Sequence, residues 1–223
     1  MNKRSTKNLL YEQVARIGKA ISSPKRLELL EVLAQAEKTV EVLAAELDID
    51  MRLASAHLKA LREARLVVAR RAGKHMIYRL SDDDVAGLWV TLREVAETHL
   101  AELRLALDKL TTDPRQLVSL GRAELLDQAR RGEITVIDVR PRDEYQAAHL
   151  PHARCMPLAE IEQRLDELPR DREIVAYCRG PFCLLAGEAL ALLARRGFRV
   201  RKLADGVSEW QAAGLPIERT AAA

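Results

Sequence analysis

Apolar side chains in the first part of the chain recur at steps of three and four residues, which predicts a series of helices. We expect helices over residues 6–20 and 25–35, then two shorter ones within TVEVLAAELDID and MRLASAHLKALREARL. Thr39 and Asp50 precede the two shorter helices, and each can accept hydrogen bonds from the first backbone amides. Two short helices joined by a three-residue turn form a helix-turn-helix.

The next segment, LVVARRAGKHMIYRL, replaces the helical period with β-branched and aromatic residues. Its two arms flank Arg71-Ala72-Gly73-Lys74, where glycine suits a turn that needs a positive φ, so we expect a β-hairpin. A hairpin directly after a helix-turn-helix is a wing. The first part of the chain is therefore predicted to be a mainly α winged helix-turn-helix.

A long helix is predicted to follow, capped by Ser81 and running to residue 110. Its apolar stripe is too long for a small domain to cover. We therefore interpret it as a dimer helix that pairs with residues 6–20 and their copies in a second chain, giving a homodimer. The stripe consists of Val85, Leu88, Leu92, Val95, His99, Leu103 and Leu110.

Residues 111–116 break this pattern and are interpreted as a linker between a domain over 1–110 and a second over 117–219, with 220–223 as a tail. Helical and strand patterns alternate in the second domain, which predicts an α/β fold with a parallel sheet covered on both faces. We expect strands at 134–139, 153–156, 173–177 and 199–203, and helices at 120–131, from 143, at 158–168, 184–196 and 206–213.

Length, cysteine usage and charge agree with this division. The 223 residues suit two domains, and three cysteines fit free thiols in the cytoplasm. No signal peptide or apolar run long enough to span a membrane is evident, so no membrane partner is expected. Residues 51–80 hold eight basic groups and one acidic group, a net charge of +7, which indicates a polyanion partner for this block.

The segments SSPKRLELLEVLA, LAAELDID, SAHLKALREARLV and GKHMIYRL resemble the ArsR family of dimeric winged-helix repressors. The resemblance implies that one helix per subunit enters the major groove of double-stranded operator DNA. Lysine and arginine contacts to phosphate would make that binding dependent on salt. The residues placed to face DNA are Arg52, Ser55, His57 and Lys59 on the helix, with Arg71 and Lys74 on the wing.

Many members of this family sense metals, but the ligand sets are missing here. The helix TVEVLAAEL has no cysteine pair, and the dimer helix offers only Asp84 and His99. His149, His152 and Cys155 fall three apart, but Pro151 disfavours the regular helix that would align them. We therefore assign neither a metal nor a cofactor. Arg65 stands where the family often has glycine, which puts the local turn geometry in doubt.

The second part of the chain resembles a single rhodanese domain through VIDVRPRDEYQAAHLPHA, AYCRG and LADGVSEWQAAGLP. The resemblance implies a sulfurtransferase with a catalytic cysteine, Cys178, that takes sulfane sulfur from a donor, becomes a persulfide and passes the sulfur to a thiol or cyanide. The alternative is a buried, inert cysteine.

The residues around Cys178 support the first interpretation. Cys178 ends a buried strand at its carboxyl end, where ligand crevices of open α/β sheets lie. Backbone amides of the loop and the following helix should form an anion site that lowers the pKa of this thiol. Asp138, at the end of a neighbouring strand, should order the pocket. The expected active-site loop is Arg179, Gly180, Pro181, Phe182 and Cys183.

Cys183 stands at the fifth position after Cys178, where the commonest rhodanese pattern has arginine, and Arg179 is at the first. This puts a preference for thiosulfate in doubt. Cys183 can attack a Cys178 persulfide to release sulfide and leave a disulfide, or it can simply be a small residue at the helix start.

Three hypotheses follow for the whole chain. The first is a dimeric repressor that releases DNA when sulfane sulfur loads Cys178. The second is a sulfurtransferase held on DNA with no signalling between the two parts. The third is a redox switch in which Cys178 and Cys183 form a disulfide without turnover.

Overall fold

The computed structural model describes residues 2–110, 117–118 and 120–220. The chain divides into two compact units, Met1–Trp89 and Val90–Ala223. The expected linker over 111–116 lies outside the described residues, so the domain boundaries named above stay predictions.

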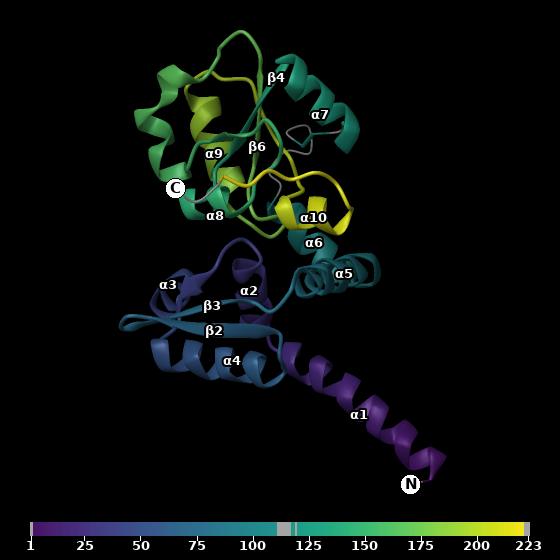
Figure 1. Cartoon of the computed structure of the whole chain (residues 1–223). Helices are drawn as coiled ribbons and strands as arrows, with labels where there is room; N and C mark the ends of the chain where they lie inside the picture. Colours follow the sequence, from purple (N-terminus) through teal and green to yellow (C-terminus); the bar gives the residue numbers. More distant parts are fainter. Residues whose placement is uncertain (1, 111–116, 119, 221–223) are drawn as a thin grey trace. The chain divides into compact units, whose positions relative to one another are not determined.

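The first unit packs four helices with a small antiparallel sheet (Figure 1). The helices are α1 (Lys3–Ile21), α2 (Pro24–Leu33), α3 (Val40–Glu46) and α4 (Met51–Glu63), and the strands are β1 (Lys38–Thr39), β2 (Val67–Ala72) and β3 (His75–Leu80). The sheet order is β1-β3-β2, and β2 and β3 form the expected hairpin with Gly73 at φ +58°. The two-residue strand β1 was not expected from the sequence.

Local capping chemistry starts α3 and α4 as predicted. The Thr39 hydroxyl accepts from the backbone amide of Val42 at 3.4 Å, and the Asp50 carboxylate accepts from those of Arg52 and Leu53 at 2.8 and 2.9 Å. These bonds satisfy amides that have no partner inside the helix. Arg65, in the turn after α4, adopts φ +63°, the left-handed conformation that explains why glycine is common there.

The long helix predicted after Ser81 is two helices, α5 (Asp83–His99) and α6 (Ala101–Leu110), with Leu100 between them. It also begins later than expected. The Ser81 hydroxyl donates to the carbonyl of Leu66 at 3.1 Å, and the Asp82 carboxylate accepts from the amide of Asp83 at 2.7 Å. Ser81 therefore fixes the end of the hairpin, and the helix starts at the acidic residues that follow it.

The second unit also contains a parallel sheet of order β5-β4-β6-β7, made of Ile134–Asp138 (β4), Arg154–Cys155 (β5), Glu173–Tyr177 (β6) and Val200–Lys202 (β7). The helices are α7 (Arg122–Arg131), α8 (Arg142–Ala147), α9 (Leu185–Arg195) and α10 (Val207–Ala212). The helix predicted over 158–168 is instead two 3₁₀ helices, Leu158–Gln163 and Leu165–Glu167, separated by Arg164 in a non-helical conformation.

Side chains of the central strands alternate between two apolar cores, one on each face of the sheet. Along β6, Ile174 and Ala176 belong to the core that contains α9, whereas Val175 and Tyr177 belong to the core that contains α7 and α10. Cys178 continues the alternation onto the α9 side. The period of the strand therefore decides which face the first cysteine of the loop occupies.

Candidate functional site

Cys178 directly follows β6 at the carboxyl edge of the sheet, and its residue is 1% exposed. Cys183 lies five residues later, just before α9, and is half-buried. The loop between them turns through Gly180, whose φ is +142°, and closes with a bond from the Cys183 amide to the Gly180 carbonyl at 3.1 Å. The two thiols are thereby brought together with free side chains.

Backbone amides converge on both sulfur atoms. Those of Gly180 and Ala186 favour the ionised form of Cys178, and those of Arg179 and Leu185 favour that of Cys183. This is the arrangement expected where a loop enters a helix N-terminus. The loop and the start of α9 therefore hold negative charge on sulfur.

The thiol with the lowered pKa, however, is Cys183 and not Cys178, for which the sequence predicted it. The Cys178–Cys183 hydrogen bond and burial raise the pKa of Cys178 well above its usual value. The same hydrogen bond lowers the pKa of Cys183 to about 6, with help from the loop amides and the Arg179 charge. The predicted lowering at Cys178 was thus wrong for the resting pair. At neutral pH the pair therefore shares one proton and one negative charge, and the pKa of Cys183 is the lower of the two.

The Arg179 guanidinium is engaged inside the protein. Its Nε donates to the carboxylate of Glu144 at 3.0 Å, and its Nη2 donates to the other oxygen of the same group. Glu144 lies on α8 and is fully buried. A buried carboxylate needs such a partner, so this arginine balances Glu144 as well as the Cys183 thiolate.

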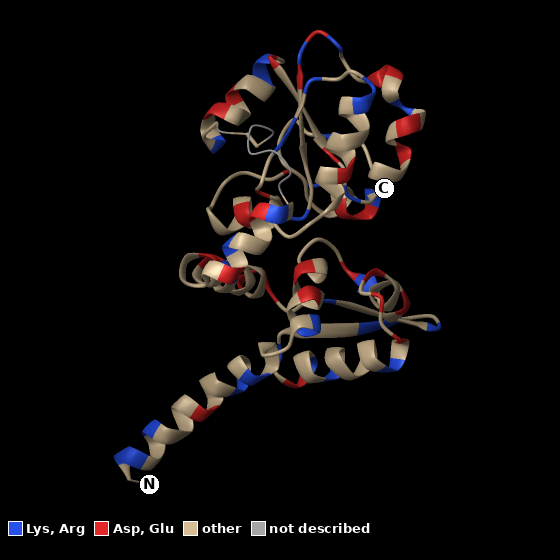
Figure 2. Ribbon diagram, turned by 180° about the vertical axis from the view of Figure 1, so that it is seen from behind, with Lys and Arg blue, Asp and Glu red and all other residues tan. Residues whose placement is uncertain are grey.

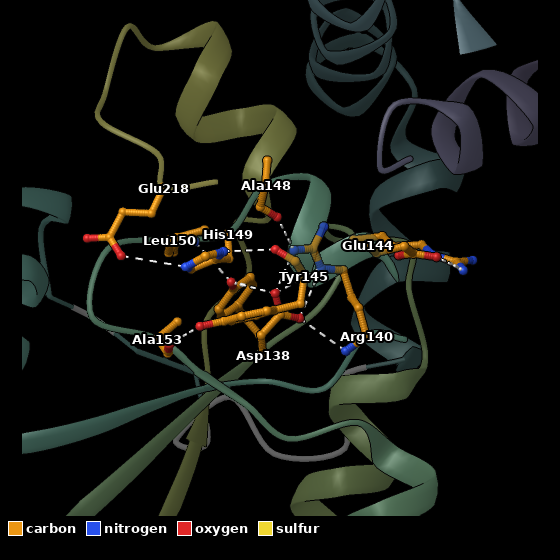
Figure 3. Close-up of polar contacts among 11 residues, drawn as sticks. Asp138, Arg140, Glu144, Tyr145, Ala148, His149, Leu150, Ala153 and Glu218 are labelled. Atoms are coloured by element: carbon orange, nitrogen blue, oxygen red, sulfur yellow. Dashed lines mark hydrogen bonds and ion pairs between the residues drawn. The ribbon is translucent and has the colours of Figure 1, made fainter. Parts of the chain in front are cut away.

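Asp138, at the end of β4, organises the neighbouring strand rather than the sulfur atoms (Figure 3). Its carboxylate accepts from the hydroxyl of Tyr177 at 2.6 Å and from Nε of Arg140 at 2.9 Å, and all three residues are fully buried. The Tyr177 hydroxyl in turn accepts from the amide of Leu150 at 3.0 Å. Tyr177 precedes Cys178, so this network fixes the end of β6 from which the loop departs.

Sequence reasoning missed two groups that lie against the loop. Gly206 approaches so closely that a Cβ on it would lie 2.6 Å from the Cys178 carbonyl oxygen, and the Glu209 carboxylate lies beside Gly180. Gly206 and Glu209 both stand inside LADGVSEWQAAGLP, one of the motifs that indicated the domain, but nothing in their spacing marked them as neighbours of the loop.

The histidines near Cys155 have other roles. His149 stacks on the ring of Tyr145 with a centroid distance of 3.8 Å, and its Nε2 lies 3.5 Å from Glu218 (Figure 3). Burial raises the pKa of Cys155, which lies on β5. Among the described residues, no three His, Cys, Asp or Glu side chains are grouped as a metal site would need.

The expected DNA contacts lie on α4 and the hairpin of the first unit, where Figure 2 shows Lys and Arg in blue. Five residues of the predicted set are exposed, namely Arg52, Ser55, Lys59, Arg71 and Lys74. His57 is half-buried, and burial together with the Arg26 charge lowers its pKa. The Arg71 guanidinium also donates to the Gly73 carbonyl at 3.0 Å, within the wing. Contact of these residues with DNA stays a prediction.

Comparison with known proteins identifies a family for each part of the chain. The model described as the bacterial regulatory protein arsR family matches residues 23–68, and that of the rhodanese-like domain matches 122–213. The HTH-type transcriptional regulator Rv0324 of Mycobacterium tuberculosis is 44% identical over 215 residues, which cover 96% of this chain and 94% of that protein. The chain belongs to the arsR family and carries a rhodanese-like domain.

Two further relatives each match one part of this arsR-family regulator. A sulfurtransferase of Allochromatium vinosum is 34% identical over 86 residues, 38% of this chain and 78% of that protein. A solution structure of the homodimeric winged helix-turn-helix DNA-binding domain of Mb0332 from Mycobacterium bovis is 41% identical, covers 46% of this chain and 93% of that chain, and gives a TM-score of 0.42. Within the described residues, no helix of the regulator is long and apolar enough to cross a membrane.

Proposed function

We propose that this arsR-family regulator is a homodimeric repressor whose rhodanese-like domain receives sulfane sulfur on Cys178, and that loading releases operator DNA. The observation that carries the proposal is the pair of thiols in one loop, sharing a proton beneath converging backbone amides. A structural cysteine pair has no need of a stabilised thiolate. The same chain carries the DNA-binding unit, so the sulfur chemistry is joined to a regulator.

The loading step follows from the state of the pair. The proton of Cys178 moves to the Cys183 thiolate, and the Cys178 thiolate attacks the terminal sulfur of a donor R–S–SH. The donor's S–S bond breaks, RS⁻ leaves, and Cys178 carries –S–SH. An acceptor thiol or cyanide then attacks the terminal sulfur and restores the Cys178 thiolate.

The donor class follows from the engagement of Arg179. The Arg179 guanidinium already binds the buried Glu144. It therefore leaves little positive charge in the loop for a doubly charged donor such as thiosulfate. An organic persulfide carries at most one charge on its –S–SH group, which places its terminal sulfur against the loop amides. We therefore expect glutathione persulfide to load Cys178 faster than thiosulfate does.

Cys183 gives the persulfide a second fate. Its thiolate can attack the inner sulfur of Cys178–S–SH, releasing HS⁻ and leaving a Cys178–Cys183 disulfide. The loop amides and the Arg179 charge, which also lower the pKa of Cys183, remain after loading and favour this step. Loading and disulfide formation are thus two successive signals from one site, and a Cys183→Ser variant separates them.

The homodimer is supported by the surface of α1. Ala20 is the one buried residue of this helix within the described chain, whereas several large apolar side chains are exposed. Large apolar side chains left exposed together along one helix mark a protein interface. The exposed residues are Leu9, Leu10, Tyr11 and Val14.

The test is operator binding by the purified full chain at one fixed salt concentration, with and without glutathione persulfide. The operator is a duplex selected by the unloaded protein from a random-sequence pool. We expect loading to weaken binding between 5- and 150-fold, about the range of known allosteric couplings. Cys178→Ala should bind DNA normally and ignore persulfide, and Cys155→Ala, the matched control, should respond like the parent.

Each result decides between the hypotheses. Equal affinity with and without full loading in the parent protein overturns the repressor proposal and leaves a sulfurtransferase held on DNA. A response retained by Cys178→Ala overturns the assignment of the receiving cysteine. A response to persulfide that disappears in Cys183→Ser assigns the signal to the disulfide.

A further inference from the structure

Glu209, on α10, supports the sulfur-handling loop from behind. Its carboxylate is 3% exposed and accepts from the backbone amide of Gly206 at 2.6 Å. A Cβ built on Gly180 would lie 3.1 Å from Glu209 Oε1, so the carboxylate packs directly on the loop backbone. Gly206 itself lies against the Cys178 carbonyl. Displacement of the loop must therefore displace this carboxylate.

Arg93 lies on α5, in the part of the helix that belongs to the second unit, and is 4% exposed. Its Nη1 donates to Glu209 Oε1 at 2.5 Å, and its Nε lies 2.9 Å from Glu97 Oε1. The guanidinium carbon also lies 5.9 Å from the centre of the Phe182 ring, within range of a cation–π contact. One buried arginine thus contacts both a residue of the loop and the carboxylate behind it.

α5 is one continuous helix that begins in the first unit. There Val85 and Ala86 belong to the hydrophobic core that also contains residues of α2 and α4. The helix with its first turns fixed in the DNA-binding unit therefore carries, two turns later, the arginine that contacts the sulfur-handling site.

We infer that Arg93 and Glu209 are positioning residues that transmit the state of the Cys178 loop to α5. This inference rests on the proposed function, and the contact that would transmit the signal is the ion pair between Arg93 and Glu209. Loading adds a sulfur atom about 2 Å from a sulfur that is already buried, and a disulfide draws Cys183 toward Cys178. Either change displaces the loop at Gly180 or Phe182. A buried ion pair has few alternative geometries, so the displacement is passed to α5.

The test compares operator affinity of loaded and unloaded full-length protein, with the loaded fraction measured by intact-protein mass spectrometry. We expect Arg93→Gln and Glu209→Gln to load Cys178 and to bind DNA within about threefold of the parent when unloaded. Their ratio of loaded to unloaded Kd should fall at least threefold, toward 1. Arg93→Lys, which keeps the charge, should retain part of the response.

Two further variants keep the result interpretable. Arg201→Gln removes an ion pair with Glu173 elsewhere on the sheet and should respond like the parent. Because a lone buried charge can prevent folding, the double variant Arg93→Gln/Glu209→Gln removes both charges at once. If the two residues act as one link, the double variant should lose no more response than either single variant.

The outcomes separate this inference from the proposed function. A parent protein that responds, with Gln variants that are fully loaded and respond equally, overturns the link and leaves the repressor proposal standing. A parent that does not respond overturns both. Loss of response in the Gln variants and in Phe182→Leu, with the Arg201→Gln control intact, supports the link.

Discussion

One proton shared by two thiols sets the pH at which the site becomes reactive. The pKa of Cys183 is lowered to about 6, so its thiolate is present above that pH and is lost as the pH falls below it. The pKa of Cys178 is raised, and this residue is almost inaccessible. An alkylating agent such as iodoacetamide should therefore react at Cys183 first, although Cys178 is the residue that receives sulfur in the proposed function.

This gives a prediction for alkylation. With iodoacetamide, the rate at Cys183 should rise with pH through a midpoint near 6, as followed by mass spectrometry of the peptide that contains it. In Cys178→Ala the thiol donor is gone, so the midpoint should move upward. Cys155, whose pKa is raised by burial, serves as the internal reference and should react only at higher pH. A Cys183 midpoint near 8.5 in the parent would contradict the shared proton.

A second residue-scale prediction concerns Asp138. Asp138→Ala leaves the fully buried Arg140 without its carboxylate, which should lower the stability of the second unit by about 3–5 kcal/mol. Native-state hydrogen exchange of the β4 and β6 amides measures this unit separately. Asp127→Ala, which removes an exposed partner of Arg131, should change exchange far less. Equal effects of the two variants would show that the buried network is not needed.

The sequence predicted the site only as far as local patterns reach. Cys178 and its loop could be identified because a buried strand, a turn and a helix follow one another along the chain. Glu209 could not, because its contact with Gly180 depends on how α10 packs. Which of Cys178 and Cys183 has the lower pKa could not be predicted either, because it depends on the hydrogen bond between the two sulfur atoms.

At the scale of elements, hydrophobic period identified the helices and strands that pack on a core, and capping residues fixed several ends. Hydrophobic period gave the wrong element where a strand or a helix end depends on hydrogen bonds rather than on the spacing of apolar residues. The strand Lys38–Thr39 is two residues long and exists because it pairs with Ile77 and Tyr78 of β3. The long stripe after Ser81 runs from His99 to Leu103 without a break in its spacing, whereas the backbone interrupts the helix between them, at Leu100.

Close packing between α10 and the loop gives the next prediction. Gly206→Ala would place a Cβ 2.6 Å from backbone atoms of Cys178 and Arg179, which a side-chain rotation cannot relieve. We expect a loss of about 1–3 kcal/mol and at least tenfold slower persulfide loading. In contrast, Gly187→Ala on α9 meets nothing within 4 Å and should stabilise the helix by roughly 0.5–1 kcal/mol. Unfolding midpoints measure the stability of the two variants, and mass spectrometry measures how fast each is loaded with persulfide. Loading of Gly206→Ala at the parent rate would contradict the close contact.

At the scale of the whole molecule, the exposed apolar face of α1 predicts that the protein is a dimer. Val14→Glu places a charge on that face, so sedimentation should show the mass falling from twice 25.0 kDa to 25.0 kDa. Operator affinity should fall more than about tenfold, because each half-site is then bound alone. Val42→Glu, at another exposed valine of the same unit, should leave the mass unchanged. A monomeric parent protein would exclude the proposed assembly.

The strand order of the parallel sheet also sets a sequence of events during synthesis. The hairpin of the first unit pairs neighbours such as Ala72 and His75, whereas β6 must wait for β7 to supply its second edge. Local pairings form sooner than distant parallel ones, and the ribosome delivers the N-terminal unit first. Pulse-labelled nascent chains should therefore protect β2 and β3 before β6. A newly made chain would then complete its helix-turn-helix and wing before the loop of Cys178. On the proposed function, such a chain would bind DNA but would not respond to sulfane sulfur until translation has passed residue 202.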